Sequence, residues 1–346
     1  MESSQQTEFM HLDVLIPGLF DGLANWPSNQ NQGKQSTALG WLLSHGNFSR
    51  QDAIGFEVSL WRCFDPELKQ GDELPVAALR TNCSDTPSIC SDPVHLQIGV
   101  TEVELLSGPD LMLSQTESDE IVTLLSDYFK EEGFRFMLDE NGLGILLLNK
   151  KANIKTTALS LVPGRLLAEK LPSGPDHSSW HQLSNEIQML FHGAAFNQKR
   201  EAAGKLPVNT LWFWGAGELV RPLKSDYQYI VSDDPLAELL AKRTDTKIIS
   251  VPESVDELFE IMPDGRTLLV LDKLLAYSQK NDYLGWARQL EKYEQHWFKP
   301  LTDNIKNKMI KSISILTSTG ERFDYLSHHR WWFWRKEYDL QDWINR

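Results

Sequence analysis

Short apolar runs alternate with amphipathic segments in the second half of the chain, and this alternation restricts the fold more than any other feature of the sequence. Four runs have the length and composition of buried strands, at 227–231, 247–251, 267–271 and 310–316. Apolar residues recur at helical spacing in the segments between them, at 235–242, 255–261 and 283–306. Such alternation is typical of a mostly parallel sheet with helices on both faces. We therefore expect an α/β fold, with ligands bound at the carboxyl ends of the strands.

The segment 107–175 has a different pattern, in which one helix is followed by a hairpin. Ser114 and Glu117 have the spacing of a capping box and predict a helix over 115–132. Two short strands are predicted after it, at 134–138 and 144–148. We expect 107–175 to form a smaller α+β insert, which divides the α/β core into 9–106 and 176–346.

The stretch 186–217 connects a predicted helix to a predicted buried strand. Ile187, Leu190 and Phe191 lie on one helical stripe. The run 208–214 is apolar and rich in aromatic residues, as buried strands are. It ends at Gly215-Ala216-Gly217, where small residues allow another group to approach the backbone closely.

Composition and charge exclude several classes of function. The chain has 346 residues, 41% of them hydrophobic, and a formal net charge of −14. This charge argues against binding to nucleic acid or to an anionic membrane, although a few arginines could still hold a small phosphorylated ligand. The three cysteines do not have zinc-site spacing, and the amino-terminal residues do not have the pattern of a secretory signal. A cytoplasmic location is therefore expected.

The central stretch also carries a resemblance to a known family. Asn197, Arg200, Gly204, Pro207 and the run 209–217 resemble a segment of the archaeal-type 2,3-bisphosphoglycerate-independent phosphoglycerate mutases. These enzymes belong to the alkaline phosphatase superfamily, so the resemblance implies an alkaline-phosphatase-like α/β fold. The likeness to bacterial RpfE-type regulatory proteins is closer still. The resemblance to the mutases covers most of the chain, from about residue 13 to 330.

The resemblance implies a set of ligand-binding residues. The segment 75–82 is similar to a strand of the family that carries an Arg-x-Asn motif, and 92–96 to a turn that leads into a strand. A small phosphorylated or acidic metabolite is the implied ligand, because an arginine can hold a phosphate through two parallel hydrogen bonds. A salt-bridge role for Arg80 and a buried structural role for His95 are the alternatives. The implied residues are Arg80, Asn82, His95, Asn197, Arg200, Asn209 and Trp214.

The residues that the family uses for its chemistry are mostly replaced. Leu275 and Gln279 stand at two metal-ligand positions, and Ser318-Thr319 at the place of an Asp-His pair. The nucleophile position falls near Ile54, which cannot attack phosphorus, and Ser59 is out of register with it. A two-metal site needs several Asp and His ligands, so we expect no cofactor. The alternative is a divalent metal such as Mn or Zn, held by residues that include Asp21, Asp272 and His328.

The run 328–335 (HHRWWFWR) is the other unusual segment. It predicts either a terminal strand or a Trp- and Arg-rich surface for a protein partner. Three hypotheses about function follow. The favoured one is a mutase-like regulatory or ligand-binding protein without metal-dependent phosphoryl transfer. The second is an active phosphomutase or phosphatase with a rearranged site, and the third is a scaffold that binds another protein through the aromatic run.

Overall fold

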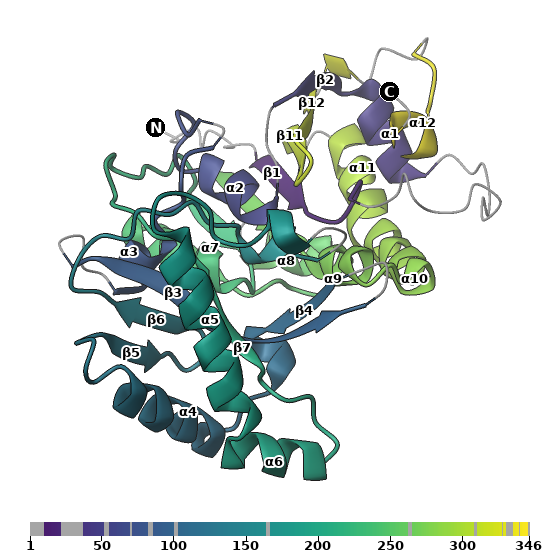
Figure 1. Ribbon diagram of the computed structural model, residues 1–346. Helices are drawn as coiled ribbons and strands as arrows, with labels where there is room; N and C mark the ends of the chain where they lie inside the picture. Colours follow the sequence, from purple (N-terminus) through teal and green to yellow (C-terminus); the bar gives the residue numbers. More distant parts are fainter. Residues whose placement is uncertain are drawn as a thin grey trace. The chain divides into compact units, whose positions relative to one another are not determined.

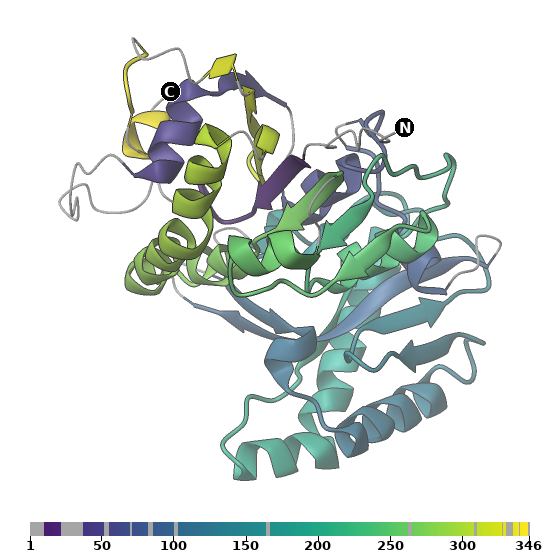
Figure 2. The ribbon, with the colours of Figure 1, turned by 180° about the vertical axis from the view of Figure 1, so that it is seen from behind.

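The chain forms two compact units, which we call unit 1 (1–70 and 223–346) and unit 2 (71–222). The predicted insert, 107–175, lies within unit 2, which begins before it and ends after it. Figures 1 and 2 show the ribbon of the chain from opposite sides. The computed structural model describes residues 10–21, 37–51, 55–69, 71–81, 86–99, 103–163, 167–261, 265–307, 310–326, 328–329, 335–338 and 340–344.

Unit 1 contains a mostly parallel sheet, as the alternating pattern predicts. In the described part of the unit it has seven strands in the order β2-β12-β11-β1-β10-β8-β9. Strands β11, β1, β10, β8 and β9 are parallel to their neighbours in this run, whereas β12 and β2 join antiparallel at one edge. The bounds are β1 (Met10–Ile16), β2 (Asn47–Arg50), β8 (Tyr229–Val231), β9 (Lys247–Ile249), β10 (Arg266–Val270), β11 (Ile310–Thr317) and β12 (Glu321–Leu326).

Helices cover both faces of this sheet, which confirms the predicted fold class. The predicted helix 283–306 consists of α10 (Tyr283–Tyr293), a π-helical turn (Glu294–Phe298) and α11 (Lys299–Lys306). The remaining helices are α1 (Ala38–His45), α2 (Phe56–Arg62), α7 (Pro235–Arg243), α8 (Val255–Ile261), α9 (Lys273–Gln279) and α12 (Leu340–Ile344).

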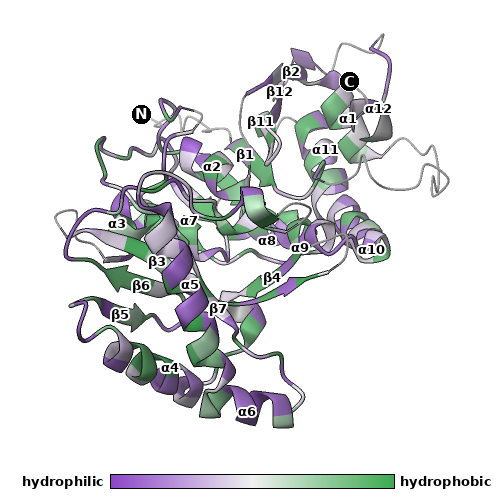
Figure 3. Cartoon of the chain, in the orientation of Figure 1, coloured by the Kyte–Doolittle hydropathy of each residue, from purple (hydrophilic) through white to green (hydrophobic). Residues whose placement is uncertain are grey.

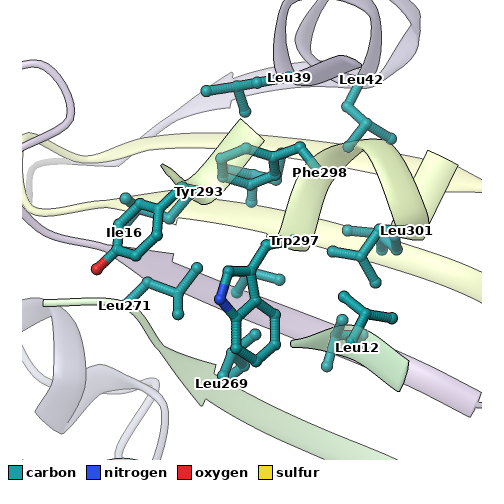
Figure 4. Close-up of a cluster of buried hydrophobic side chains, with 14 of the residues drawn as sticks. Leu12, Ile16, Leu39, Leu42, Leu269, Leu271, Tyr293, Trp297, Phe298 and Leu301 are labelled. Carbon is teal, nitrogen blue, oxygen red and sulfur yellow. The ribbon is translucent and has the colours of Figure 1, made fainter. Parts of the chain in front are cut away.

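One face of the sheet forms an apolar core. Alternate residues of β1, from Met10 to Ile16, are fully buried in a cluster with side chains of α1, α8, α10 and α11. Figure 4 shows Trp297 of the π-helical turn in this cluster, lying over Leu269. Figure 3 colours the chain by hydropathy. In it β1 is hydrophobic, whereas α10 carries both hydrophilic and hydrophobic residues. Each fully buried Leu or Phe side chain contributes about 1.5–3 kcal/mol.

The opposite face carries a row of polar residues across three neighbouring strands. Asp13 of β1 is in register with Ser314 of β11, which is in register with Asp324 of β12. Side chains alternate between the two faces of a strand, so this row lies opposite the core side chains of Leu12 and Val14. The helices α2 and α7 pack outside that core cluster, with buried residues of their own.

Unit 2 is built on an antiparallel sheet of five described strands, in the order β4-β3-β6-β5 with β7 also paired to β3. The long strand β3 (Ser88–Ile98) joins the others. Side chains of α4 and α5 share one apolar cluster with the strands and so cover one face. The other bounds are β4 (Val103–Ser107), β5 (Arg135–Leu138), β6 (Gly144–Leu147), β7 (Thr210–Trp214), α3 (Val76–Thr81), α4 (Gln115–Tyr128), α5 (His177–His192) and α6 (Ala195–Ala202), with 3₁₀ turns at Gly108–Leu111, Leu159–Leu161 and Leu167–Glu169.

Several local predictions for unit 2 are confirmed and two are wrong. The capping box of Ser114 and Glu117 is present, and β7 is the predicted buried strand. The segment 75–82 was expected as a strand, but Val76–Thr81 is helix α3; its run of Ala, Leu and Arg favours a helix, and Pro75 is compatible with a helix start. Asp92-Pro93 was expected as a turn, but both residues lie inside β3.

None of the helices in the described part of the chain is long and apolar enough to cross a membrane.

Candidate functional site

The loop after β1 holds Asp21 in contacts with the ends of neighbouring segments of unit 1. Its Oδ2 accepts the backbone N–H of Gly18 at 2.9 Å and the hydroxyl of Ser318, which follows β11. Burial raises the pKa of Asp21, while the hydrogen bonds from Ser318 and Gly18 oppose that shift. The carboxylate therefore closes a turn within the protein.

Gly18 allows this turn to pack closely against the backbone of helix α9. Its φ is +80°, and a methyl group added to it would lie 2.5 Å from the backbone nitrogen of Leu275. Its carbonyl accepts the indole N–H of Trp286 at 2.8 Å. The backbone of Leu275 therefore packs directly against the turn that holds Asp21.

Carboxylates also follow β8 and β10, at the strand ends where a ligand is expected. Asp234 is the N-cap of α7 and accepts the backbone N–H groups of Leu236 and Ala237 at 2.8 and 3.1 Å. Burial raises its pKa to about 7, with further contributions from the charges of Asp272 and Glu57. Burial likewise raises the pKa of Asp272. Asp234 and Asp272 are therefore carboxyl groups at the starts of helices α7 and α9 whose charged forms are disfavoured by burial.

The residues at the strand ends do not fit the divalent metal site that the resemblance implies. Over the described ranges, no group of three or more His, Cys, Asp or Glu side chains is placed to hold a metal ion. Asp21, Asp272 and His328 are therefore not gathered into such a group. His328 is exposed and its ring lies against that of the buried His329, whose Nδ1 is 3.3 Å from the backbone nitrogen of Leu326.

The predicted ligand residue Arg80 lies in unit 2, in a buried ion pair. Its Nη1 and Nη2 donate to the two carboxylate oxygens of Asp92, at 2.5 and 3.2 Å. Asp92 also accepts the backbone N–H of Gly144 and the indole N–H of Trp214. Trp214, another predicted ligand residue, lies beneath the Arg80 guanidinium. This network joins α3 to the strands of unit 2.

The other predicted ligand residues of unit 2 make internal hydrogen bonds as well. The side-chain amide of Asn197 bonds the backbone of Phe191 and Val208, and that of Asn209 bonds both the N–H and the carbonyl of Leu96. His95 Nδ1 is 2.8 Å from the carbonyl oxygen of Pro207.

Arg200 is bonded within unit 2 too. It donates to the carbonyls of Leu206 and Leu111 and to Glu117. These bonds give all of the six described residues structural roles, and their part in ligand binding stays a prediction.

Two sets of predicted residues lie outside the described part of the chain. Asn82 is one of them. Most of the aromatic run is the other, since 330–334 fall outside and only His328, His329 and Arg335 of it are described. Arg335 donates to the carbonyls of His45 and Gly46 and so attaches to the end of α1.

A cavity of about 500 Å³ lies wholly within unit 1, over the polar face of its sheet. Its volume is in the range of small-molecule sites. Four cationic side chains line it, together with the acidic Asp226 and Glu321. The cationic residues are Arg62, Lys69, Arg266 and Arg322.

The polar row of β1, β11 and β12 positions two of these arginines. Arg266 donates to Asp13 at 2.9 Å, and Asp13 also accepts the hydroxyl of Tyr227. Arg322 donates through Nε to both oxygens of Asp324, at 2.9 and 3.1 Å, and through Nη2 to Ser314. Asp13 is only 7% exposed, so without these partners its charge would be costly to bury.

Arg62, in the last turn of α2, is held differently. Its Nε is buried and has no hydrogen-bond partner among the residues that the structure describes. A buried N–H without an acceptor is unusual in a folded protein. Beside it, burial raises the pKa of the Cys63 thiol to about 12. This cysteine therefore lines the cavity as an uncharged thiol at physiological pH.

The cavity was not predicted from the sequence. A signal for it was present: Ser312, Ser314, Arg322 and Asp324 alternate with apolar residues, which indicates strands with one polar face. Arg62 gave no such signal, because a basic residue in the last turn of a helix is common.

Comparisons with known proteins give one sequence relative. No protein family model matches the chain. The chain is 24% identical over 216 residues to the 2,3-bisphosphoglycerate-independent phosphoglycerate mutase of Methanosarcina barkeri, across 57% of this chain and 53% of that enzyme. It thus spans about half the length of this curated relative.

Two solved structures are similar over 92% of this chain. One is the cofactor-independent phosphoglycerate mutase of Thermoplasma acidophilum, with 14% identity, 90% of that chain covered and a TM-score of 0.42. The other is a protein of Pyrococcus horikoshii, with 13% identity, 88% covered and a TM-score of 0.47. In sequence, the chain is distantly similar to a 2,3-bisphosphoglycerate-independent phosphoglycerate mutase.

Proposed function

We propose that this chain is a phosphoglycerate-mutase-like protein that binds a small acidic or phosphorylated metabolite and does not carry out metal-dependent phosphoryl transfer. A regulatory role in the cytoplasm, as in the RpfE-type proteins it resembles, is part of this proposal. The observation that carries it is the position of Asp21, whose carboxylate accepts hydrogen bonds from Gly18 of its own turn and from Ser318, which follows β11.

The surroundings of Asp21 support the proposal. A hard divalent cation needs several oxygen or nitrogen ligands close together. Around Asp21 the described neighbours supply a backbone N–H and a hydroxyl that donates, and, after burial, the charge of Glu321 contributes to the raised pKa of Asp21. The described contacts of the Asp21 carboxylate are therefore those of a structural hydrogen-bond acceptor.

A metal titration combined with an activity assay tests this proposal. Calorimetry with Mn²⁺ and Zn²⁺ should give no stoichiometric binding, and assays for phosphoglycerate mutase and phosphomonoesterase activity should give no turnover with either metal. The Asp21→Asn variant should behave in the same way as the wild type in both measurements. Stoichiometric binding with turnover, both lost in Asp21→Asn, would instead support the hypothesis of an active enzyme with a rearranged site.

A further inference from the structure

We propose that the cavity of unit 1 is a binding site for a small organic dianion, a phosphomonoester or a dicarboxylate, held by Arg62, Arg266 and Arg322. This inference deepens the proposed function by locating its ligand, and it rests on that proposal only for the biological role. The site lies over the polar face of the sheet, and its cationic residues come from α2, β10 and β12.

Unused hydrogen-bond donors are the first observation for such a site. The Nε of Arg62 is buried and lacks an acceptor within the described ranges. Arg322 uses Nε and Nη2 in its bonds to Asp324 and Ser314, which leaves its Nη1 for another acceptor. Arg62 also lines the cavity. An anionic oxygen there would accept hydrogen bonds from the terminal N–H groups of Arg62 and from Nη1 of Arg322, because guanidinium groups form strong charge-assisted bonds with phosphate and carboxylate.

Preorganisation is the second observation. Asp13 accepts a hydrogen bond from Arg266. The Cζ of Arg266 also lies 5.1 Å from the centre of the Tyr227 ring. Asp324 and Ser314 fix Arg322 in the same manner. Two guanidinium groups are therefore held in place before any ligand arrives, so little side-chain freedom would be lost on binding.

The acidic residues of the cavity restrict the class of ligand. Glu321 is already an acceptor for the hydroxyls of Thr317 and Thr319 and pairs with Arg50 at 3.2 Å. Asp226 is largely exposed and lies 3.7 Å from Arg266. Asp13 and Asp324 already pair with Arg266 and Arg322, so the lining carries no large excess of positive charge. A small ligand that accepts hydrogen bonds from guanidinium groups through one or two anionic groups is therefore favoured over a highly charged one.

Binding of simple probes to the metal-free full chain tests the site. Inorganic phosphate, a phosphomonoester such as glycerol phosphate, and succinate would each be titrated in buffer with a chelator, with thermal shift and calorimetry as readouts. We expect saturable stabilisation by at least one class, and the comparison between the phosphate and dicarboxylate probes identifies which. Absence of saturation with every probe at about 10 mM, well above a millimolar dissociation constant, would overturn the inference.

Matched variants locate the binding. Arg62→Met removes the charge and keeps the bulk of the side chain, and we expect at least about tenfold weaker binding, equivalent to about 1.4 kcal/mol. Arg62→Lys should restore part of the affinity, and Arg243→Met, at an exposed position of α7, should match the wild type. Equal affinity of Arg62→Met and the wild type would place the ligand elsewhere and overturn the inference.

A direct localisation keeps the test independent of how the variants fold. Wild-type crystals soaked in tungstate, a heavy tetrahedral dianion, should show its density within hydrogen-bond distance of Arg62 and Arg322. Density only at other positions would refute the site. Neither result depends on metal binding or turnover, so this inference and the proposed function fail separately.

Discussion

Arg80 and Asp92 form a doubly hydrogen-bonded ion pair in the interior of unit 2, with side chains 6% and 0% exposed. Asp92 also accepts hydrogen bonds from Gly144 and Trp214. We predict that Asp92→Asn lowers the free energy of unfolding by about 3–5 kcal/mol, because it leaves the buried guanidinium without a counter-charge. Urea denaturation measures this loss.

The exposed ion pair of Lys151 and Glu218, with side chains 66% and 59% exposed, provides the control in the same unit. Glu218→Gln should change the free energy of unfolding by less than about 0.5 kcal/mol, since exposed pairs contribute little. A loss below about 1 kcal/mol for Asp92→Asn would show that the buried pair contributes no more than a surface one.

Asp234 should make unit 1 more stable as the pH falls. Its pKa is about 7 in the folded protein, mainly through burial, against an ordinary value of 3.8. Between pH 7 and 4 the folded state therefore binds a proton that the unfolded state does not, so this group raises stability as the pH decreases, by at most about 1.4 kcal/mol per pH unit. Asp234→Asn keeps an oxygen that can cap α7 and removes the charge.

The expected result for Asp234→Asn is greater stability than the wild type at pH 8 and a smaller gain on acidification. Thermal unfolding at several pH values measures both. Asp256→Asn, at an exposed position of α8, serves as the control and should keep the pH dependence of the wild type. Parallel pH profiles for Asp234→Asn and the wild type would contradict the prediction.

Gly18 and Gly71 separate two costs of replacing a glycine. Both have positive φ, +80° and +83°, but a methyl group on Gly71 would meet nothing within 4 Å, whereas on Gly18 it would lie 2.5 Å from Leu275. Gly71→Ala should cost about 1 kcal/mol for the backbone conformation alone. Gly18→Ala should cost about 2 kcal/mol more, because the packed backbone of Leu275 has to move. Equal losses in chemical denaturation would argue against close packing at this turn.

The sequence was a good guide to the elements whose signal is local. The apolar runs of β8, β10 and β11 and the capping box of Ser114 predicted strands and a helix that the structure contains. The helix over Val76–Thr81 was not predicted. The resemblance of this segment to a strand of the mutase family conflicts with the helix propensity of its Ala, Leu and Arg residues, and the helix propensity prevails. The π-helical turn was not predicted either, because a single turn of five residues is too short to give a periodicity of its own within 283–306.

The candidate site was harder to predict because it depends on contacts between distant segments. Arg62 is separated from Arg266 and Arg322 by more than half of the chain, and no spacing rule connects the three residues. Conversely, the resemblance to the mutase family implied Arg200 and Asn197 as ligand residues. Their polar atoms are bonded to backbone groups of their own unit, which only the three-dimensional arrangement reveals.

The row of Asp13, Ser314 and Asp324 has a consequence for how the edge of the unit 1 sheet assembles. Phe323 and Asp324 are neighbours on β12, and Phe323 belongs to the apolar cluster. A slip of β12 by a single residue would exchange their faces, placing a carboxylate among the leucines and a phenyl ring beside the arginines. The charged groups beside the cavity thus also fix the register in which β12 pairs with β11.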